Sequence, residues 1–447
     1  MVDWRKYWNE PIETMSRQEL EGLQFRRLKR QLNNIYHNSS YYRGVMREIG
    51  TSPEDIKSLG DFTKFPVTYK DSVRELISAG DPFGGLLCIP FEEIKFIYST
   101  TGTTGIPSIH AMTKEDQEYA AEQTARLTWM QGFRPGDVLF WPPVRWNGFI
   151  FGVTPGLEKI GVVSITNILY PLPNYADKMV YALKHIRPDV MAAPIVIFDG
   201  FLEACKRLGE KPAEVCESLR AISIGYGDVL TNSYRQKLIK EAGLEPEKIF
   251  SGGGAADTMI HLAECEVREG THICEDLYLA EILDLDTKEP VGENERGELI
   301  LSNLYMRGTP LIRWGSEDIS TFSRETCKCG RTHGRATWIG RTGFQLNVMG
   351  KWILPLDVDD LFIDVPEAAG VPFTLFKYKK GVMEKLKMKM VYDGSKGLTK
   401  EEFREKVSGI IKEKLGVETD IEIVGSIDDL PKIAHKYKRV EDLTKES

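Results

Sequence analysis

The sequence contains a short stretch of hydroxyl-bearing residues and glycines, STTGTTG at residues 99–105, whose composition is typical of a loop that binds phosphate. Gly102 and Gly105 permit positive φ angles and a close approach of the backbone to a ligand. The threonine hydroxyl groups can donate hydrogen bonds to anionic oxygens. An ordinary polar loop would have the same composition, and the Gly-Lys-Ser/Thr ending of a Walker loop is absent. The candidate phosphate-binding residues are Ser99, Thr100, Thr101, Gly102, Thr103, Thr104 and Gly105.

Two local pairs of cysteine and histidine residues form a second group that could carry chemistry. A tetrahedral zinc ion needs four sulfur or nitrogen ligands, often supplied as two such pairs. The pattern C-x6-H followed by C-x-C meets this number, although its spacing is not that of a common zinc finger. Cys274 and His333 are competing candidates, and a set of reduced surface cysteines is the alternative interpretation. The four candidate ligands are Cys265, His272, Cys327 and Cys329.

The elements that position these residues alternate between apolar runs and helical patterns. Strands are expected at DVLF, VVSIT, VMAAPIVIF, AISIG and EKIFSGGG, and helices over residues 115–134, 177–186 and 198–208. A strand ending at Tyr98, the glycine-rich loop and the helix that follows it would present backbone N–H groups to a phosphate. This alternation predicts an α/β domain with a substantial parallel sheet.

Residues 16–48 predict a long helix near the N-terminus. Ser16 and Glu19 form the pattern of a capping box at its start. The leucines of one helical face are Leu20, Leu23, Leu28 and Leu32.

The C-terminal fifth of the chain differs in composition and is dense in lysine and glutamate. LKMKMVYDG and TDIEIVG predict strands, and TKEEFREKVSGIIKEKLG predicts a capped amphipathic helix that ends at Gly416. We therefore expect a small α+β domain over residues 343–447 after a large α/β domain over residues 1–342. Gly343, in GRTGFQ, is the expected hinge because glycine absorbs a large change in φ and ψ.

Length and composition limit the class of protein. A chain of 447 residues with 42% hydrophobic and 28% charged residues is typical of a soluble globular protein with two or three domains. A net charge of −8 argues against a nucleic-acid binder, and no apolar run approaches the roughly 18 residues of a membrane helix. The first residues lack the apolar core of a signal peptide, and the odd number of cysteines, seven, favours a reducing compartment. These features predict a cytoplasmic enzyme, although a binding protein would share them.

An ordered series of motifs resembles the phenylacetate–CoA ligases, a family of adenylate-forming enzymes. IYSTTGTTGIPSIHAMT is similar to the signature loop of that family. YWNEPIETMSRQELEGLQFRRLK, NSSYYRGVMREIG and DFTKFPVTYKDSVRE are similar to its N-terminal region. RGELILSNL, TPLIRWGSED, CGRTHGR and IGRTGFQLNVMGKWILP follow its later motifs in order. The resemblance spans nearly the whole chain.

The resemblance implies an AMP-forming acid–CoA ligase whose large domain binds ATP and the acid and whose small, mobile domain carries a catalytic lysine. Members of the family join an acid to AMP with loss of pyrophosphate; the small domain then rotates, and the CoA thiol attacks the acyl-adenylate. Matched positions imply that Asp318 accepts hydrogen bonds from ribose hydroxyls, with Arg341 as its polar neighbour. They also imply that Lys436, in LPKIAHKYKRVEDL, is the adenylation lysine. From the residues alone, a surface acid, a structural arginine and a solvated basic tail are the favoured interpretations.

The sequence departs from the family where phosphates and magnesium are handled. The loop proline has no lysine beside it, and Ala255 stands where the family has a glutamate that helps to hold Mg²⁺. Asp257, and Asp228 in SIGYGDVL, are the candidate substitutes near the metal. The segment FSGGGAADT also supplies two further candidate nucleotide-binding residues, Gly252 and Gly253.

The resemblance places the acyl pocket beside WNGFIFG, AAPIVIF and SIGYGD. Aromatic and apolar walls suit an aryl or arylalkyl acid, although a medium-chain acid stays open and any one of these side chains could belong to the core. The candidate walls are Trp146, Phe149, Ile195 and Tyr226.

Relatives in the family carry similar cysteine and histidine residues, so the resemblance implies a structural Zn²⁺ that joins segments 265–272 and 327–329. The remaining cysteines lie in apolar contexts and are expected in the core. They are Cys88, Cys205 and Cys216.

Two hypotheses for function follow. In the first, the protein is an active ligase that uses ATP, Mg²⁺, CoA and a small carboxylic acid, and a homodimer is one form it can take. In the second, it is a divergent relative that binds an acyl-CoA or an acyl-adenylate without ATP chemistry.

Overall fold

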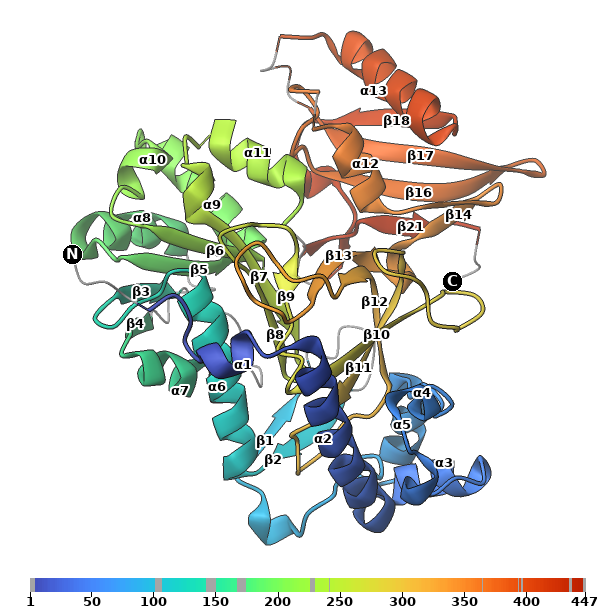
Figure 1. Ribbon diagram of the computed structural model, residues 1–447. Coiled ribbons are helices and arrows are strands. Elements are labelled where there is room, and N and C mark those ends of the chain that lie inside the picture. The colour runs from blue at the N-terminus through green and yellow to red at the C-terminus, as the bar shows by residue number, and fades with distance from the viewer. Residues whose placement is uncertain are drawn as a thin grey trace. The chain divides into compact units, whose positions relative to one another are not determined.

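The computed structural model describes residues 5–100, 107–141, 150–166, 174–225, 230–240, 242–363, 365–392, 394, 397–433 and 436–444 (Figure 1). The chain divides into two compact units. The large unit comprises residues 1–210, 214–228 and 247–338, and the small unit comprises residues 211–213, 229–246 and 339–447. The sequence predicted one boundary at Gly343, whereas the small unit also takes in two earlier segments of the chain.

A mixed sheet of eleven strands forms the framework of the large unit (Figure 1). Its strand order is β10-β11-β12-β13-β9-β8-β7-β6-β5-β3-β4. The neighbours from β4 to β7 are parallel, whereas β7–β8, β8–β9, β9–β13, β10–β11 and β11–β12 are antiparallel. The strands are β3 (Val138–Trp141), β4 (Val163–Thr166), β5 (Val190–Pro194), β6 (Ala221–Gly225), β7 (Ile249–Ala255), β8 (Ile260–Glu264), β9 (Thr271–His272), β10 (Tyr278–Leu283), β11 (Gly297–Asn303), β12 (Trp314–Ser323) and β13 (Arg335–Arg341).

Helices alternate with the parallel strands, which confirms the predicted α/β organisation. They are α6 (Lys114–Met130), α7 (Ile150–Ile160), α8 (Tyr175–Ile186), α9 (Ile195–Leu208) and α10 (Pro212–Val215). The strand predicted over VMAAPIVIF is too long: β5 ends at Pro194 and Ile195 begins α9. Pro194 has no N–H group to continue a strand ladder, and its extended backbone suits the N-cap of a helix.

The N-terminal region is a set of helices: α1 (Glu10–Glu13), α2 (Arg17–Asn38), α3 (Ser40–Glu48), α4 (Leu59–Phe62) and α5 (Lys70–Ser78). The capping box of Ser16 and Glu19 is present at the start of α2. The helix predicted over residues 16–48 is divided at Ser39, because the Ser39 side chain accepts the backbone N–H of Tyr42 and begins α3. Of the predicted apolar face, Leu23 is only half-buried.

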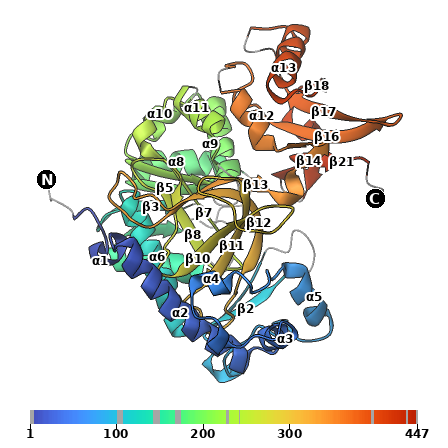
Figure 2. The same cartoon turned by 45° about the vertical axis from the view of Figure 1, so that its right-hand side comes forward.

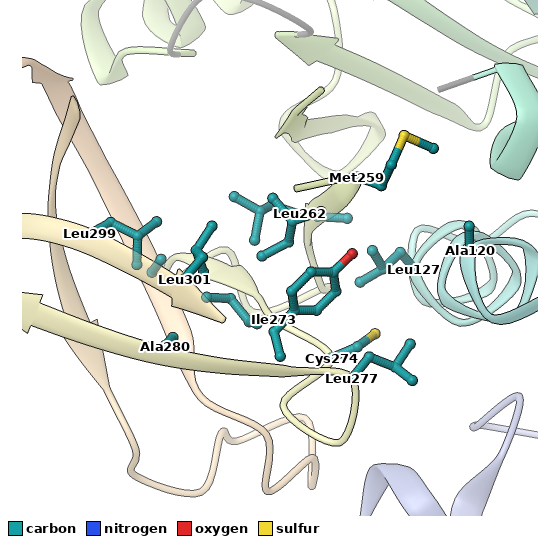
Figure 3. Close-up of a cluster of buried hydrophobic side chains, with 14 of the residues drawn as sticks. Ala120, Leu127, Met259, Leu262, Ile273, Cys274, Leu277, Ala280, Leu299 and Leu301 are labelled. Carbon is teal, nitrogen blue, oxygen red and sulfur yellow. The ribbon is translucent and has the colours of Figure 1, made fainter. Parts of the chain in front are cut away.

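The largest hydrophobic cluster packs α6 against the antiparallel half of the sheet (Figure 3). Ala120 and Leu127 come from α6, while Leu262 comes from β8. Leu299 and Leu301 come from β11 and lie across the cluster in Figure 3. The helix that follows the glycine-rich segment is therefore fixed to the sheet by apolar burial.

The small unit is built on a four-stranded sheet in the order β18-β17-β16-β21, with α13 packed on β18 (Figure 2). Thr399 caps the start of α13 and Gly416 adopts the left-handed conformation at its end, as the sequence predicted. The elements of this unit are α11 (Asn232–Lys240), β14 (Leu346–Val348), β15 (Lys351–Ile353), α12 (Pro355–Leu361), β16 (Phe373–Lys380), β17 (Met383–Val391), α13 (Lys400–Leu415), β18 (Thr419–Val424), β19 (Lys432–Ile433), β20 (Lys436–Tyr437) and β21 (Val440–Asp442). In the part of the chain described here, no helix is long and apolar enough to cross a bilayer.

Candidate active site

The carboxyl ends of the parallel strands bring several of the predicted residues to one edge of the sheet. Pro194 of β5 pairs with Gly225 of β6, and Gly225 pairs with Gly252 of β7. Ile195 follows directly after β5, and Gly253 continues β7. In open α/β sheets, ligands bind at this edge, where the strands end.

Many of the predicted ligand-binding residues lie outside the described residues. These are Thr101, Gly102, Thr103, Thr104, Gly105, Trp146, Phe149, Tyr226 and Asp228. The residues that flank them form the part of the site that the structure describes.

The glycine-rich segment joins two antiparallel strands, so the predicted strand–loop–helix arrangement is wrong. β1 (Phe96–Ser99) pairs with β2 (Ile109–Met112), and Ser99 lies opposite Ile109. The Thr100 N–H extends this ladder by donating to the Ser108 carbonyl at 3.1 Å. The helix α6 begins only at Lys114, after β2, and its N-terminal turn is capped by Thr113 and Asp116.

A lysine from outside the segment supplies positive charge at the base of this hairpin. Lys70, the first residue of α5, donates from Nζ to Thr100 Oγ1 at 3.1 Å. Its Nζ also lies 3.4 Å from Asp257 Oδ1. Ser108 Oγ donates to the same Asp257 oxygen at 2.9 Å. Lys70 lies in the stretch DFTKFPVTYKDSVRE, but nothing in that stretch predicted its role, because its partners lie far away in the sequence.

Asp257 is the acid of this cluster, and it is held in its ionised form. His110 Nε2 lies 3.6 Å from Asp257 Oδ1, and the imidazole is fully buried and stacked on Tyr98. Burial disfavours the ionised form and by itself would raise the pKa of Asp257. The contacts with His110, Lys70 and Ser108 outweigh burial and hold the pKa of Asp257 well below its usual range. A carboxylate therefore stands beside Thr100 and Ser108 at neutral pH.

The structure places three further predicted residues, Asp318 in the large unit and Arg341 and Gly343 in the small unit. Asp318 lies on β12 and is 9% exposed. Arg341 is the last residue of β13, and Gly343 lies in the single turn of 3₁₀ helix at Thr342–Phe344. A Cβ atom added at Gly343 would meet no neighbour within 4 Å, so the structure has room for a side chain at this position.

Lys436 lies in a small hairpin of the small unit. It opens β20, and its backbone pairs with Ile433 of β19. The structure places the backbone of Lys436 only.

The four predicted metal ligands come together in a buried cluster. One ligand atom from each of Cys265, His272, Cys327 and Cys329 lies within 4.8 Å of all the others. Cys265 Sγ is 3.7 Å from Cys327 Sγ, and Cys329 Sγ is 3.6 Å from His272 Nε2. A tetrahedral zinc ion would separate two sulfurs by about 3.8 Å and a sulfur and nitrogen by about 3.6 Å. The spacing therefore fits a zinc ion and is too long for a disulfide.

The surroundings of the cluster favour its role as a set of ligands. His272 Nδ1 donates to the His333 carbonyl at 3.1 Å, which leaves Nε2 to face the sulfurs. A hydrogen bond from Cys265 and the neighbouring imidazole of His272 lower the pKa of the Cys329 thiol, and the thiolate is the form that binds metal. Arg335 Nη1 lies 3.5 Å from Cys327 Sγ and offsets negative charge there.

The competing candidates are not part of this cluster. His333 uses both ring nitrogens, accepting from the Glu275 N–H at 2.9 Å and donating to the Ile12 carbonyl at 2.9 Å. Within the described chain, the group of potential ligands does not include Cys274, although that thiol is buried. The cysteines predicted to be core residues, Cys88, Cys205 and Cys216, are buried.

Comparisons with known proteins concern the chain as a whole. No family model matches the chain. The chain is 27% identical to a phenylacetate–CoA ligase of Thermus thermophilus, covering 97% of this chain and 99% of that protein. It is 28% identical to a phenylacetate–CoA ligase of Aromatoleum evansii, covering 85% and 83%. Among solved structures, 2-hydroxyisobutyryl-CoA ligase in complex with 2-HIB-AMP superposes with a TM-score of 0.86 at 22% identity, covering 99% and 93%.

The fold is that of the adenylate-forming CoA ligases. The curated proteins that the chain resembles over most or all of its length are phenylacetate–CoA ligases, so the predicted resemblance is confirmed. Its homologues are CoA ligase enzymes.

Proposed function

We propose that this protein is an AMP-forming acid–CoA ligase that activates an aryl or arylalkyl carboxylic acid. The contact of Lys70 Nζ with Thr100 Oγ1 is the observation that carries the proposal. It brings to the glycine-rich segment a positive charge that residues 99–105 themselves lack. A site of this kind is expected in an enzyme that handles phosphates rather than in a chain that has lost that chemistry.

In the first step, a carboxylate oxygen of the acid attacks the α-phosphorus of ATP. The bond between the α-phosphorus and the bridging oxygen breaks, and pyrophosphate leaves. Lys436 is proposed to neutralise the negative charge that develops between the carboxylate and the α-phosphate, a task that suits a mobile ammonium group.

Lys70 and Thr100 are proposed to hold the β- and γ-phosphates together with Ser99 and residues 101–105. ATP bears about four negative charges, and metal neutralisation commonly contributes several kcal/mol to the transition state. Asp257 offers a carboxylate oxygen, the donor that Mg²⁺ prefers, and Asp228 is the second proposed oxygen ligand. Magnesium bound there would supply charge neutralisation that Ala255 cannot.

The remaining nucleotide contacts are proposed from the matched motifs. Asp318 would accept hydrogen bonds from the ribose hydroxyls, with Arg341 as a polar neighbour. Gly252 and Gly253 at the end of β7 would allow the nucleotide to approach the backbone closely.

In the second step, the sulfur of CoA attacks the acyl carbonyl carbon, and AMP leaves with the electron pair of the acyl–phosphate bond. The small domain, 343–447, is proposed to reorient about Gly343 between the two steps, while residues 1–342 act as the large domain. The chain contains seven cysteines, an odd number that suits a reducing compartment and supports the proposal of a cytoplasmic enzyme.

The acid is proposed to bind where β3, β5 and β6 end, against Ile195 and residues 146, 149 and 226. The names of the curated relatives favour phenylacetate or a similar acid. The solved neighbour acts on a small hydroxy acid, so aliphatic acids belong in the test.

The test measures AMP released by the purified chain with ATP, Mg²⁺ and CoA, against a panel of aryl, arylalkyl and aliphatic acids. We expect acid-dependent AMP, highest with an aryl or arylalkyl acid, and its loss in Lys436→Ala. No AMP with any acid from well-folded protein would refute the proposal. An aliphatic acid as the best substrate would refute the aryl specificity alone.

A second candidate, a binding protein for acyl-CoA or acyl-adenylate, is favoured by one observation. Ala255 cannot hold magnesium, and the nearest acid, Asp257, already contacts Lys70. Binding of phenylacetyl-CoA without AMP release in the same assay would support this alternative.

We further propose that the four-residue cluster holds a structural Zn²⁺. Cys265 and His272 would bind it from the segment around β9, and Cys327 and Cys329 from the segment before β13. Bound zinc would join these two segments without taking part in the reaction.

A further inference from the structure

The hairpin that carries Lys436 is too short to hold a stable orientation by itself. Its strands β19 and β20 have two residues each, with Lys432 opposite Tyr437 and Ile433 opposite Lys436. An isolated two-stranded hairpin is marginal in water even when it is longer. The position of Lys436 must therefore depend on how the base of the hairpin is attached to the rest of its unit.

The base is attached through the backbone of the two residues that follow β20. The Lys438 N–H donates to the Pro431 carbonyl at 2.6 Å and closes the hairpin. Thr374 Oγ1 donates to the Lys438 carbonyl at 2.6 Å. The Leu375 N–H donates to the Arg439 carbonyl at 2.9 Å. These bonds tie the end of the hairpin to the start of β16.

One pair of side chains, Arg439 and Asp359, stabilises this attachment. Arg439 Nη2 donates to Asp359 Oδ2 at 2.5 Å, and the guanidinium lies 4.6 Å above the ring of Phe373. Asp359 lies on α12 and is 7% exposed, while Phe373 is fully buried. Burial raises the pKa of Asp359, and Arg439 opposes that shift. Because Asp359 is buried and Arg439 half-buried, removing the guanidinium leaves the buried carboxylate uncompensated.

We propose that Asp359 and Arg439 are positioning residues that aim the hairpin carrying Lys436 during adenylation. Arg439 lies three residues after Lys436, so a shift at this anchor is passed directly along the chain to the lysine. Misplacing a catalytic group by about 1 Å can lower a rate by about 100-fold. The inference rests on the proposed role of Lys436 and assigns the pair a function beyond stabilising the small unit.

The first test is hydrogen–deuterium exchange of the full-length protein, which needs no substrate. Asp359→Asn keeps the shape of the side chain but removes its charge, and Arg439→Lys keeps the charge but loses the planar, stacked guanidinium. In either variant we expect faster exchange at the amides of Lys438 and Leu375. Arg439→Lys also keeps the test open if Asp359→Asn does not fold.

The matched control is Glu418→Gln, a carboxylate-to-amide change in the same unit. Glu418 is exposed and pairs with Lys385 at 3.3 Å and Lys412 at 3.1 Å. Exchange at Lys438 and Leu375 should stay at the wild-type rate in this variant. Wild-type exchange in both Asp359→Asn and Arg439→Lys would overturn the inference.

The second test separates the two half-reactions, with phenylacetate and ATP for adenylation and phenylacetyl-adenylate and CoA for thioester formation. We expect kcat for adenylation to fall by roughly tenfold or more in Asp359→Asn, with KM for ATP and the thioester half-reaction changed by less than about twofold. An equal fall in both half-reactions would show a merely structural role and overturn the inference. If Lys436→Ala itself leaves adenylation unchanged, the proposed role of Lys436 fails first, and this inference fails with it.

Discussion

Among single residues, Lys70 has the contacts that bear most directly on nucleotide binding. Its ammonium group lies between the hydroxyl of Thr100 and the carboxylate of Asp257. Because Ser108 and His110 also face that carboxylate, Asp257 keeps polar neighbours if Lys70 turns toward a phosphate. In the proposed function, this arrangement would supply the positive charge that the glycine-rich segment lacks.

We therefore predict that Lys70→Met weakens the adenylation step. The apparent affinity for ATP should fall by about tenfold or more, in line with the loss of a charge-assisted hydrogen bond. Thioester formation from supplied acyl-adenylate should be unchanged, as measured by CoA consumption. Lys64→Met is the control, because Lys64 is exposed and pairs only loosely with Asp61 at 3.9 Å. Equal ATP affinity in Lys70→Met and wild type would contradict the prediction.

The lowered pKa of Asp257 leads to a prediction of how the stability of the protein depends on pH. A carboxyl whose folded pKa is lowered contributes stability above its unfolded pKa, about 4, and loses that contribution as the pH falls through the folded pKa. The melting temperature of Asp257→Asn should therefore lie below that of wild type at about pH 7, with a gap that narrows below about pH 4. Differential scanning calorimetry across this range measures the gap.

The control for this series is Asp71→Asn, since Asp71 is 84% exposed at its side chain and pairs with Arg74 on the surface. Its melting temperature should stay close to that of wild type at every pH. A gap for Asp257→Asn that is constant with pH would be the contrary outcome.

At the scale of elements, the segment between Cys327 and His333 connects the proposed zinc site to the N-terminal segment. Tyr7 OH donates to the Cys329 carbonyl at 3.1 Å. Arg331 pairs with Glu13 at 2.7 Å, and both side chains are 5% exposed. Because these partners sit on the segment that holds two of the four proposed ligands, a metal there would also stabilise the docking of residues 5–17.

Removing the metal should therefore loosen the N-terminal segment. We expect the purified protein to contain one zinc per chain and the chelated protein to be cut faster by protease within residues 5–17. Metal analysis and mass spectrometry of the fragments measure both effects. Cys329→Ser should lose the zinc, whereas Cys274→Ala should keep it because Cys274 is not one of the clustered ligands. Zinc-free protein with wild-type protease resistance would contradict both expectations.

The sequence predicted those elements whose signals are local. The capping boxes at Ser16 and Thr399 marked helix starts correctly, because the residues that make them are three positions apart. It missed β2, a strand of four residues whose existence depends on pairing with β1 across the glycine-rich segment. The sequence identified the four clustered residues because cysteine and histidine are recognisable candidate metal ligands by type alone. Lys70 and His110, in contrast, have contacts that depend on neighbours distant in the sequence.

At the scale of the whole molecule, the two proposed functions make different demands on ligand binding. A ligase must bind ATP with magnesium before CoA chemistry can occur, while a binding protein needs affinity only for the acyl compound. A ligand that binds the folded state alone raises its stability by RT ln(1 + [L]/Kd). A rise in melting temperature therefore reports the binding of ATP or CoA even when the carboxylic acid substrate is not known.

We predict that ATP with Mg²⁺ raises the melting temperature of the full chain more than CoA does at the same concentration. The shift should be smaller in Lys70→Met, because that variant lacks the charge beside Thr100. Differential scanning fluorimetry at matched ligand concentrations makes the comparison. A larger shift with CoA, and none with ATP, would favour the binding protein.

The division into units also shows a limit of reading a domain boundary along the chain. The charged composition after Gly343 predicted a small domain over residues 343–447, and the small unit includes residues 339–447. Residues 229–246, however, group with that unit because α11 packs with α12. Such a segment joins a domain through tertiary packing, and nothing in its own composition distinguishes it from its neighbours in the sequence.

The contacts of the N-terminal segment have a consequence for how the protein is made. Arg331 and Glu13 are 318 positions apart, and His333 and Ile12 are 321 apart. At a synthesis rate of about 5–20 residues per second, the segment waits roughly 15–60 s for its partners to leave the ribosome. During that time Ile12 and Glu13 lack these native partners. The first residues to be synthesised are thus among the last to reach their native positions.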